Sequence, residues 1–228
     1  MIGQPLASVI MPAYRAERFV CEAIESALAQ DYGSVELIVV DDGSDDATAE
    51  LAARYPITVL HQPHSGIAAA RNTGVRATNG AYLAIHDADD TWPPDRLSAQ
   101  IEYLEAEPDA GIVLGLAEVF THPGEERFDQ MSPLTRGRPV QGLPATMLAR
   151  REVFERVGEF DETLELGEDI DWLARAMDAG VKSVTLERVV LRRRVHATNA
   201  TIDTSRNRAA VMAVLRRSVH RQRARGDD

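Results

Sequence analysis

The chain has 228 residues, of which 44% are hydrophobic and 27% charged, an ordinary balance for one globular domain with a buried core. Its formal net charge of −11 argues against nucleic acid as the main partner, because phosphate backbones select surfaces rich in lysine and arginine. Because no apolar run reaches the roughly 20 residues that cross a bilayer, no signal-peptide pattern opens the chain and Cys21 is the one cysteine, we expect a soluble, cytoplasmic protein.

Short apolar strands alternate with helices through the first half of the chain. The strands are predicted from short apolar runs, and the helices from apolar residues at helical spacing. Expected strands span 7–14, 35–40, 57–61 and 81–85, and expected helices span 18–30, 47–55, 66–78 and 94–107. Such alternation with short links predicts a parallel sheet covered by helices.

The second half contains strands, helices and one long irregular stretch. Residues 121–142, rich in glycine, proline and charge, are predicted to form a mobile loop. Strands are expected at 111–120 and 183–196, a strand that turns into a short helix at 146–158, and helices at 167–180 and 206–225. Since the chain shows no repeat and no linker, we predict a single domain over residues 1–228.

Three carboxylates follow the expected strand in "AYLAIHDADDTWPPDRL" (81–97). Asp87 and Asp89 are two residues apart, so on extended backbone they point to the same side. Hard oxygen ligands on one side, with room for water and phosphate, suit Mg²⁺ or Mn²⁺. Repulsion between these carboxylates and Asp90 also favours a bound cation. The alternative is a solvated acidic turn that caps the helix beginning near Pro94.

Polar residues also follow the first two strands, and ligands bind where the carboxyl ends of parallel strands share an edge. In "VVDDGSDDAT", Asp41 could accept the N3–H of a uracil-type base while Tyr14 stacks on that base. Asp45 and Asp46 fit a turn that caps the next helix. Arg71, on a mostly apolar helix, requires an anionic partner, which could be a phosphate, an edge aspartate or an ordinary internal ion pair.

The expected C-terminal helix carries seven arginines and a short apolar stripe. Val211, Leu215 and Val219 lie four residues apart and predict a face that docks on the rest of the protein. The arginine-rich remainder is compatible with packing on an acidic domain or with a homodimer contact. The alternative is peripheral contact with an anionic membrane surface or with a lipid-phosphate acceptor.

Four segments occur in an order and spacing typical of a known family: "SVIMPAYRAERFVCEAIESALAQDY", "VELIVVDDGSDDAT", "GIAAARNTGVRATNGAYLAIHDADDTWPPDRL" and "GEDIDWLARAMDAG". Together they resemble soluble bacterial family 2 glycosyltransferases with the GT-A fold, over residues 7 to about 198. The resemblance implies an α/β fold with one Rossmann-like, mostly parallel sheet flanked by helices, a C-terminal acceptor-side extension and a terminal helix. It divides the domain into a nucleotide-sugar-binding half at about 1–110, an acceptor-binding half at about 111–205 and a basic helix at 206–228.

The same resemblance implies inverting, metal-dependent transfer of a sugar from a nucleoside-diphosphate sugar such as a UDP-sugar, with Mn²⁺ or Mg²⁺ as cofactor. Asp169 in "GED" corresponds to the general base and Asp89 to a metal ligand. His196 corresponds to a histidine that reaches the metal or diphosphate in some relatives, although "RRRVHATN" departs from the frequent "Y-R-x-H" form. The positions that correspond to the nucleotide-sugar site are Pro12, Ala13, Tyr14, Glu17, Asp41, Arg71, Asp87 and Glu168.

Two other functions stay open from the sequence. A non-catalytic sugar-nucleotide-binding protein would have no need of both Asp89 and Asp169. A sugar nucleotidyltransferase would require a glycine-rich, basic loop after the first strand, which "MPAYRAERF" lacks. The acceptor could be a saccharide, a peptide, a lipid phosphate or a small molecule. Near the candidate base, Asp171 is expected to be solvated, and Trp172 to pack on the helix face and line the acceptor side.

Overall fold

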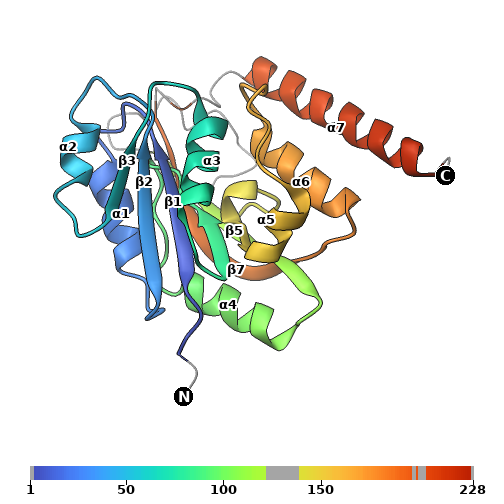
Figure 1. Ribbon diagram of the computed structural model, residues 1–228, viewed down its shortest axis with the longest axis horizontal. Helices are drawn as coiled ribbons and strands as arrows, with labels where there is room; N and C mark the ends of the chain where they lie inside the picture. The colour runs from blue at the N-terminus through green and yellow to red at the C-terminus, as the bar shows by residue number, and fades with distance from the viewer. Residues whose placement is uncertain (1–2, 122–138, 197–198, 200–203, 227–228) are drawn as a thin grey trace.

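The computed structural model describes residues 3–121, 139–196, 199 and 204–226, and in the last range the side chains of 208–223. Most of the predicted mobile loop, residues 122–138, therefore lies outside the described residues. The described chain forms a seven-stranded sheet with helices on both faces (Figure 1). None of the described helices is both long and apolar enough to cross a lipid bilayer.

The strands and α-helices follow one another as the sequence predicts, each within a few residues of its expected bounds, whereas the sequence pattern does not predict the short 3-10 helix at Pro144–Thr146. The strands are β1 (Ala7–Ala13), β2 (Val35–Asp41), β3 (Thr58–His61), β4 (Tyr82–Ile85), β5 (Ala110–Thr121), β6 (Leu148–Arg150) and β7 (Lys182–Val195). The helices are α1 (Val20–Leu28), α2 (Thr48–Ala52), α3 (Ile67–Ala77), α4 (Arg96–Ala106), the short 3-10 helix η2 (Pro144–Thr146), α5 (Arg151–Val157), α6 (Glu168–Asp178) and α7 (Thr204–Gly226). The predicted α/β class is confirmed.

The strand order in the sheet is β3-β2-β1-β4-β6-β5-β7. β1 pairs in parallel with β2 and β4, and β2 pairs in parallel with β3, so the carboxyl ends of these four strands lie at one edge. β6 runs antiparallel to both β4 and β5, whereas β5 and β7 pair in parallel. The sheet is therefore mostly parallel, as predicted, with one antiparallel strand inside it.

Residues of β1 alternate between two cores, because successive side chains of a strand point to opposite faces of its sheet. Val9 and Met11 belong to a core that includes α1 and α4, whereas Ile10 belongs to a core that includes α3, α5 and α6. Figure 1 shows α1 and α3 on opposite sides of the sheet. Burial on both faces explains why the sequence of β1 is a nearly continuous apolar run.

Gly74 allows α3 to lie very close to β1. A Cβ atom at this position would collide with the side chain of Ile10. Gly74 is buried on α3, three residues after the buried Arg71 and on the same face of the helix. The close approach of α3 to β1 therefore fixes where the backbone of Arg71 stands relative to the sheet.

Helix α7 packs on α6 through a largely polar face. Val214 is fully buried there. One turn further on, Ser218 donates to Asp178 of α6 at 3.0 Å, and Arg221 and Gln222 donate to the same carboxylate at 2.9 and 2.8 Å. A single acidic residue of α6 thus holds three side chains of α7.

The docking stripe predicted from Val211, Leu215 and Val219 is wrong. Leu215 and Val219 are 51% and 47% exposed, so they face away from the protein. The reason is that α6 presents the carboxylates of Asp171 and Asp178 to α7, and these select arginine, glutamine and hydroxyl groups rather than an apolar stripe.

Candidate active site

The segment after β1 lies at the carboxyl edge of the sheet. Pro12 and Ala13 are buried at the end of β1, and Ala13 pairs in register with Asp41 at the end of β2. Glu17 is exposed, and its carboxylate accepts a hydrogen bond from the Ala47 N–H at 3.1 Å. Of the predicted nucleotide-binding segment, Pro12 and Ala13 lie in the edge itself, whereas the Glu17 side chain turns to the loop before α2.

Asp41 and Tyr14 occupy neighbouring places at this edge, together with two histidines. Asp41 is 5% exposed; one of its oxygens accepts the Ser44 N–H at 3.2 Å, and the other lies 3.3 Å from Nδ1 of His61. Tyr14 is 40% exposed and stacks on His64, with ring centroids 4.1 Å apart. One face of the ring predicted to stack on a base is therefore covered by an imidazole.

Asp42 holds His64 against Tyr14. Its buried carboxylate accepts from Gln62 Nε2 at 2.7 Å and from the N–H groups of Ser65 and Gly66 at 2.9 Å each. Nδ1 of His64 lies 2.8 Å from the same carboxylate. The loop after β3 is thereby fastened to the end of β2.

Arg71 connects the end of β4 with the start of α6. Its side chain is 3% exposed; Nη2 donates to Asp87 at 2.9 Å and Nη1 donates to Glu168. Among the partners that the sequence left open, the structure contains these internal ion pairs. Nε of Arg71 is buried and has no hydrogen-bond partner among the described residues.

The two ion pairs shift the pKa values of all three groups. Burial alone would lower the pKa of Arg71, but Asp87 and Glu168 raise it above its ordinary value. Burial would raise the pKa of Asp87, yet the charge of Arg71 brings it below its ordinary value. Burial keeps the pKa of Glu168 raised, because Arg71 offsets only part of that effect. Arg71 is therefore a permanent cation between two carboxylates of different proton affinity.

Asp89, which follows β4, meets the end of β7. Its Oδ2 lies 3.0 Å from Nε2 of His196 and accepts from Asn199 Nδ2 at 2.9 Å. The His196 side chain is 5% exposed. In the same turn, Asp90 accepts the Arg194 N–H at 2.8 Å. The last strand of the sheet is thus bonded to the acidic turn after β4, and the predicted pair of Asp89 and His196 lies together.

The donor atoms around Asp89 fit a divalent cation that takes few protein ligands. A carboxylate oxygen beside an imidazole nitrogen suits Mn²⁺, and the carboxylate suits Mg²⁺. Among the described residues, no group of three or more His, Cys, Asp or Glu side chains could hold a metal alone. Sites of this kind complete their shell with substrate phosphates and water. Asp89 and His196 would hold the ion, which when bound supplies Lewis-acid stabilisation of negative charge.

Asp169 lies in the first turn of α6. The helix starts after Gly167, whose φ of +82° lies in the left-handed region that favours glycine. Asp169 is partly exposed, and its neighbour Glu168 is buried against Arg71. The candidate base is therefore next in sequence to Glu168. The guanidinium of Arg71 that binds Glu168 also binds Asp87 of the acidic turn.

Two further residues of α6 differ from expectation. Asp171 is not solvated: it is 2% exposed and pairs with Arg175 at 2.8 Å and with Arg221 at 3.3 Å. Trp172 packs as predicted, with its ring centroid 4.2 Å from that of Phe154, but it is fully buried and does not line an acceptor surface. Both corrections follow from α6 being covered by α5 on one side and by α7 on the other.

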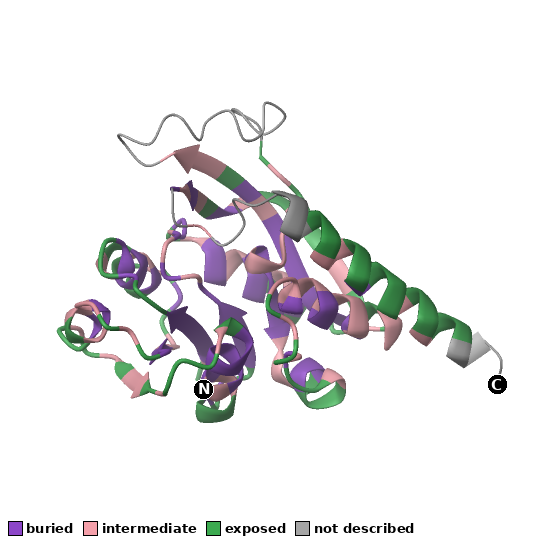
Figure 2. Cartoon of the chain, turned by 90° about the horizontal axis from the view of Figure 1, so that it is seen from above, coloured by how far each residue is buried: buried purple, intermediate pink, exposed green. Residues whose placement is uncertain are grey.

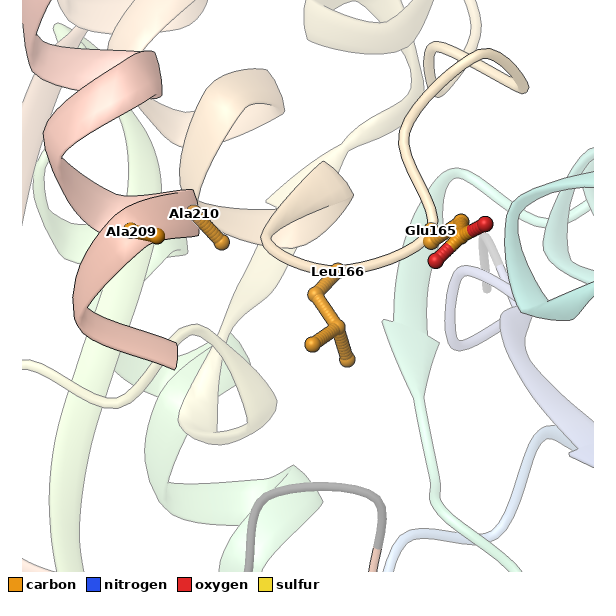
Figure 3. A pocket seen from close by; sticks show the side chains of 4 residues that line it. All are labelled: Glu165, Leu166, Ala209 and Ala210. Atoms are coloured by element: carbon orange, nitrogen blue, oxygen red, sulfur yellow. The ribbon is translucent and has the colours of Figure 1, made fainter. Parts of the chain in front are cut away.

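A hollow of about 270 Å³ lies between α7 and the loop that precedes α6 (Figure 3). Glu165, Leu166, Ala209 and Ala210 line it. The loop carrying Glu165 and Leu166 leads directly into the first turn of α6. Helix α7 therefore borders the loop that leads into the first turn of α6.

Three side chains at this edge are not predicted from the sequence: those of His61, His64 and Asn199. The two histidines lie in "HQPHSG" at the end of β3. Because β3 pairs in parallel with β2, its carboxyl end lies at the same edge of the sheet. The predicted parallel pairing could therefore have indicated that these two histidines lie near Asp41. Asn199 follows His196 by three residues, and its contact with Asp89 depends on a turn that spacing alone does not reveal.

A family model described as Glycosyl transferase family 2 matches residues 8–160 of this chain. The chain is 31% identical over 222 residues to an uncharacterized glycosyltransferase of Rickettsia prowazekii, an alignment that covers 88% of this chain and 67% of the relative. It is 36% identical over 199 residues to the succinoglycan biosynthesis protein ExoO of Rhizobium meliloti, covering 77% and 57% of the two chains. The chain spans between about a quarter and two thirds of the length of the curated relatives it matches.

Solved structures give the same picture of the fold. TarS of S. aureus in complex with UDP-GlcNAc is similar with a TM-score of 0.75 and 18% identity, over 95% of this chain and 66% of that one. The mannosyltransferase PcManGT of Pyrobaculum calidifontis in complex with GDP-Man and Mn²⁺ is similar with a TM-score of 0.67 and 25% identity, over 87% and 59%. Both have the GT-A fold, and the predicted fold is confirmed.

Proposed function

This chain belongs to glycosyl transferase family 2, and from that premise we propose that it moves a sugar from a nucleoside-diphosphate sugar to an acceptor hydroxyl, with inversion at the anomeric carbon. The observation that carries this proposal is the chain of contacts from Asp87 through Arg71 to Glu168, with Asp89 on one side of it and Asp169 on the other. Within one domain, we assign the donor to residues of about 1–110 and the acceptor to residues of about 111–205.

The proposed reaction is a single displacement. The acceptor oxygen attacks the anomeric carbon from the face opposite the diphosphate and forms the new C–O bond. The bond from the anomeric carbon to the phosphate oxygen breaks, and the nucleoside diphosphate leaves with the electron pair. Asp169 accepts the proton of the acceptor hydroxyl, since it is a partly exposed carboxylate in the first turn of α6.

We assign the donor nucleotide to the edge formed by β1, β2 and β3, and we propose UDP. The buried carboxylate of Asp41 offers an acceptor for the N3–H of uracil, and Tyr14 offers an aromatic face. Asp87 would lie near the ribose, and Arg71 would hold Asp87 and Glu168 in place beside the sugar and diphosphate. His61 and His64 would then be neighbours of the base as well.

Donor binding is the first test. Thermal shift with a panel of UDP-sugars and GDP-sugars should show a larger rise in melting temperature for a UDP-sugar, and only with Mn²⁺ or Mg²⁺ present. Asp89→Asn should lose the metal-dependent part of the shift. If no nucleotide sugar raises the melting temperature with either ion, the proposed donor is wrong.

Turnover is the second test. Release of nucleoside diphosphate should fall by a factor of about 10²–10⁴ in Asp169→Asn, because a general base contributes that much. Donor binding should be retained. Glu155→Gln, which changes an exposed carboxylate on α5, is the matched control and should keep wild-type turnover. Equal turnover in Asp169→Asn and wild type would refute the base assignment, and donor binding without any turnover would favour a sugar-nucleotide-binding protein.

A further inference from the structure

The arginines of helix α7 form ion pairs on its inner face, which packs on the protein, but not on its outer face, as far as the described side chains show. On the inner face, Arg217 pairs with Asp161 at 2.8 Å, and Arg221 pairs with Asp171 and Asp178 at 3.3 and 2.9 Å. The positive charge on this side is therefore neutralised within the protein. Figure 2 shows the opposite side of α7 as mostly exposed along its length.

The outer face combines apolar and basic side chains. Met212, Leu215 and Val219 are 50%, 51% and 47% exposed, at the spacing that lines one side of a helix. They form a shallow groove of about 440 Å³ with the basic side chains Arg216, His220 and Arg223. Among the described side chains, none forms an ion pair with Arg216 or Arg223. The helix contains no acidic residue that could neutralise them.

We propose that this outer face of α7 binds the surface of an anionic lipid bilayer, with the helix lying in the headgroup region. Arginine side chains beside an apolar stripe can reach the lipid headgroups while the stripe enters the interface. Each arginine near an anionic leaflet adds favourable energy, while the three apolar side chains enter the boundary of the acyl chains. The net positive charge is local to this helix. The chain as a whole carries −11, so an anionic bilayer would repel the rest of the protein.

A second copy of the chain is the other occupant to consider. Two α7 helices packed face to face would place Arg216 and Arg223 of both copies close together. Residues 204–226 contain no acidic side chain that could neutralise these arginines. Like charges in that arrangement oppose association. A bilayer supplies negative charge and an apolar layer in one plane, which matches the arrangement of the outer face.

The test is sedimentation of the full chain with vesicles, which requires no knowledge of donor or acceptor and is independent of the proposed function. The probe is phosphatidylcholine vesicles with and without phosphatidylglycerol. Binding should occur with phosphatidylglycerol only and should weaken as salt is raised. Arg216→Gln with Arg223→Gln should weaken binding by about tenfold or more, since each arginine contributes near the surface.

Two matched variants make the result specific. Arg54→Gln with Lys182→Gln removes the same charge from exposed residues elsewhere and should bind vesicles like wild type. Leu215→Gln should weaken binding but keep its dependence on salt. Circular dichroism would show whether each variant is folded. The salt dependence of vesicle binding is measured on the wild type, so this part of the test holds even if a variant fails to fold.

Three outcomes would overturn the proposal. The first is no binding to phosphatidylglycerol vesicles at low salt. The second is an equal loss of binding in the control pair of charge variants, which would indicate net charge alone. The third is a concentration-dependent dimer that Leu215→Gln abolishes while vesicle binding is absent, which would assign the outer face to a second copy.

Discussion

The carboxyl edge of the sheet and the α6–α7 pair both contain buried carboxylates, but they hold them in different ways. At the edge, Asp42 accepts from the backbone N–H groups of Ser65 and Gly66 in the loop after β3, and from the side chain of Gln62. In the α6–α7 pair, Asp178 accepts from the side chains of Ser218, Arg221 and Gln222, which lie 40 or more residues away along the chain.

This difference indicates which part of the molecule can vary without loss of the site. A backbone N–H is present with any side chain except proline, so a substitution at Ser65 can leave this donor in place. Side-chain donors depend on one helix being docked, so substitutions on α7 act on α6 and the loop before it. Arg71 is the residue where the two regions meet, because it binds Asp87 on one side and Glu168 on the other.

The largest effect on stability is expected for Arg71→Met, which removes the ion pairs that connect the carboxyl edge with α6. Removing one partner from a buried ion pair leaves Glu168 uncompensated and should lower the free energy of unfolding by about 3–5 kcal/mol. Urea denaturation measures the change. Arg71→Met with Glu168→Gln should recover part of the loss, and Arg76→Met, on the exposed side of α3, should cost less than about 1 kcal/mol. A double variant no more stable than Arg71→Met would contradict this account.

A smaller effect is expected at the contact between α6 and α7. Val214→Ala removes fully buried methyl groups and should cost about 1–3 kcal/mol, with faster amide exchange in α7. Val219→Ala makes the same change on the outer face and should stay within about 0.5 kcal/mol. Equal effects at both positions would show that the docking face has been assigned incorrectly.

At the carboxyl edge, Tyr14→Ala should weaken UDP binding by about threefold to tenfold, because an aromatic pair contributes roughly 0.5–1.5 kcal/mol beyond its buried area. Stability should change little, since Tyr14 is exposed. Calorimetric titration with UDP measures the affinity, and Tyr14→Phe should retain it because the ring is kept. Unchanged affinity in Tyr14→Ala would remove this ring from the base site.

The smallest effect concerns pH. Burial would raise the pKa of Asp178, but hydrogen bonds from Gln222, Arg221 and Ser218 bring it below its ordinary value. A carboxylate whose pKa is lower in the folded state adds stability above its unfolded pKa of about 4 and loses it as the pH falls further. Wild type and Asp178→Asn should therefore differ in free energy of unfolding near neutral pH and converge in acid. Parallel curves for the two proteins throughout would be evidence against this role.

Much of the fold and part of the site could be predicted from the sequence. The edge that gathers Tyr14, Asp41, Asp87 and Asp89 follows from apolar runs that end in polar residues, since parallel strands end together. The contact between Asp89 and His196 came only from the family resemblance, because no local pattern relates two residues 107 positions apart.

The face of α7 that docks could not be predicted for a different reason. Apolar spacing indicated Leu215 and Val219, and such a stripe normally marks the buried side of a helix. The real docking face is decided by Asp171 and Asp178, which lie on another helix and have no counterpart in the local pattern. A polar interface is visible only when both of its sides are known.

The reach of β7 has a consequence for how the protein is made. Its end delivers His196 to Asp89 and the Arg194 N–H to Asp90, which were synthesised more than a hundred residues earlier. On the ribosome, β1 to β4 emerge with their aspartates while these partners are still to come. A chain interrupted before β7 therefore carries the carboxyl ends of β1 to β4 but lacks the contacts that Asp89 and Asp90 make with the end of β7.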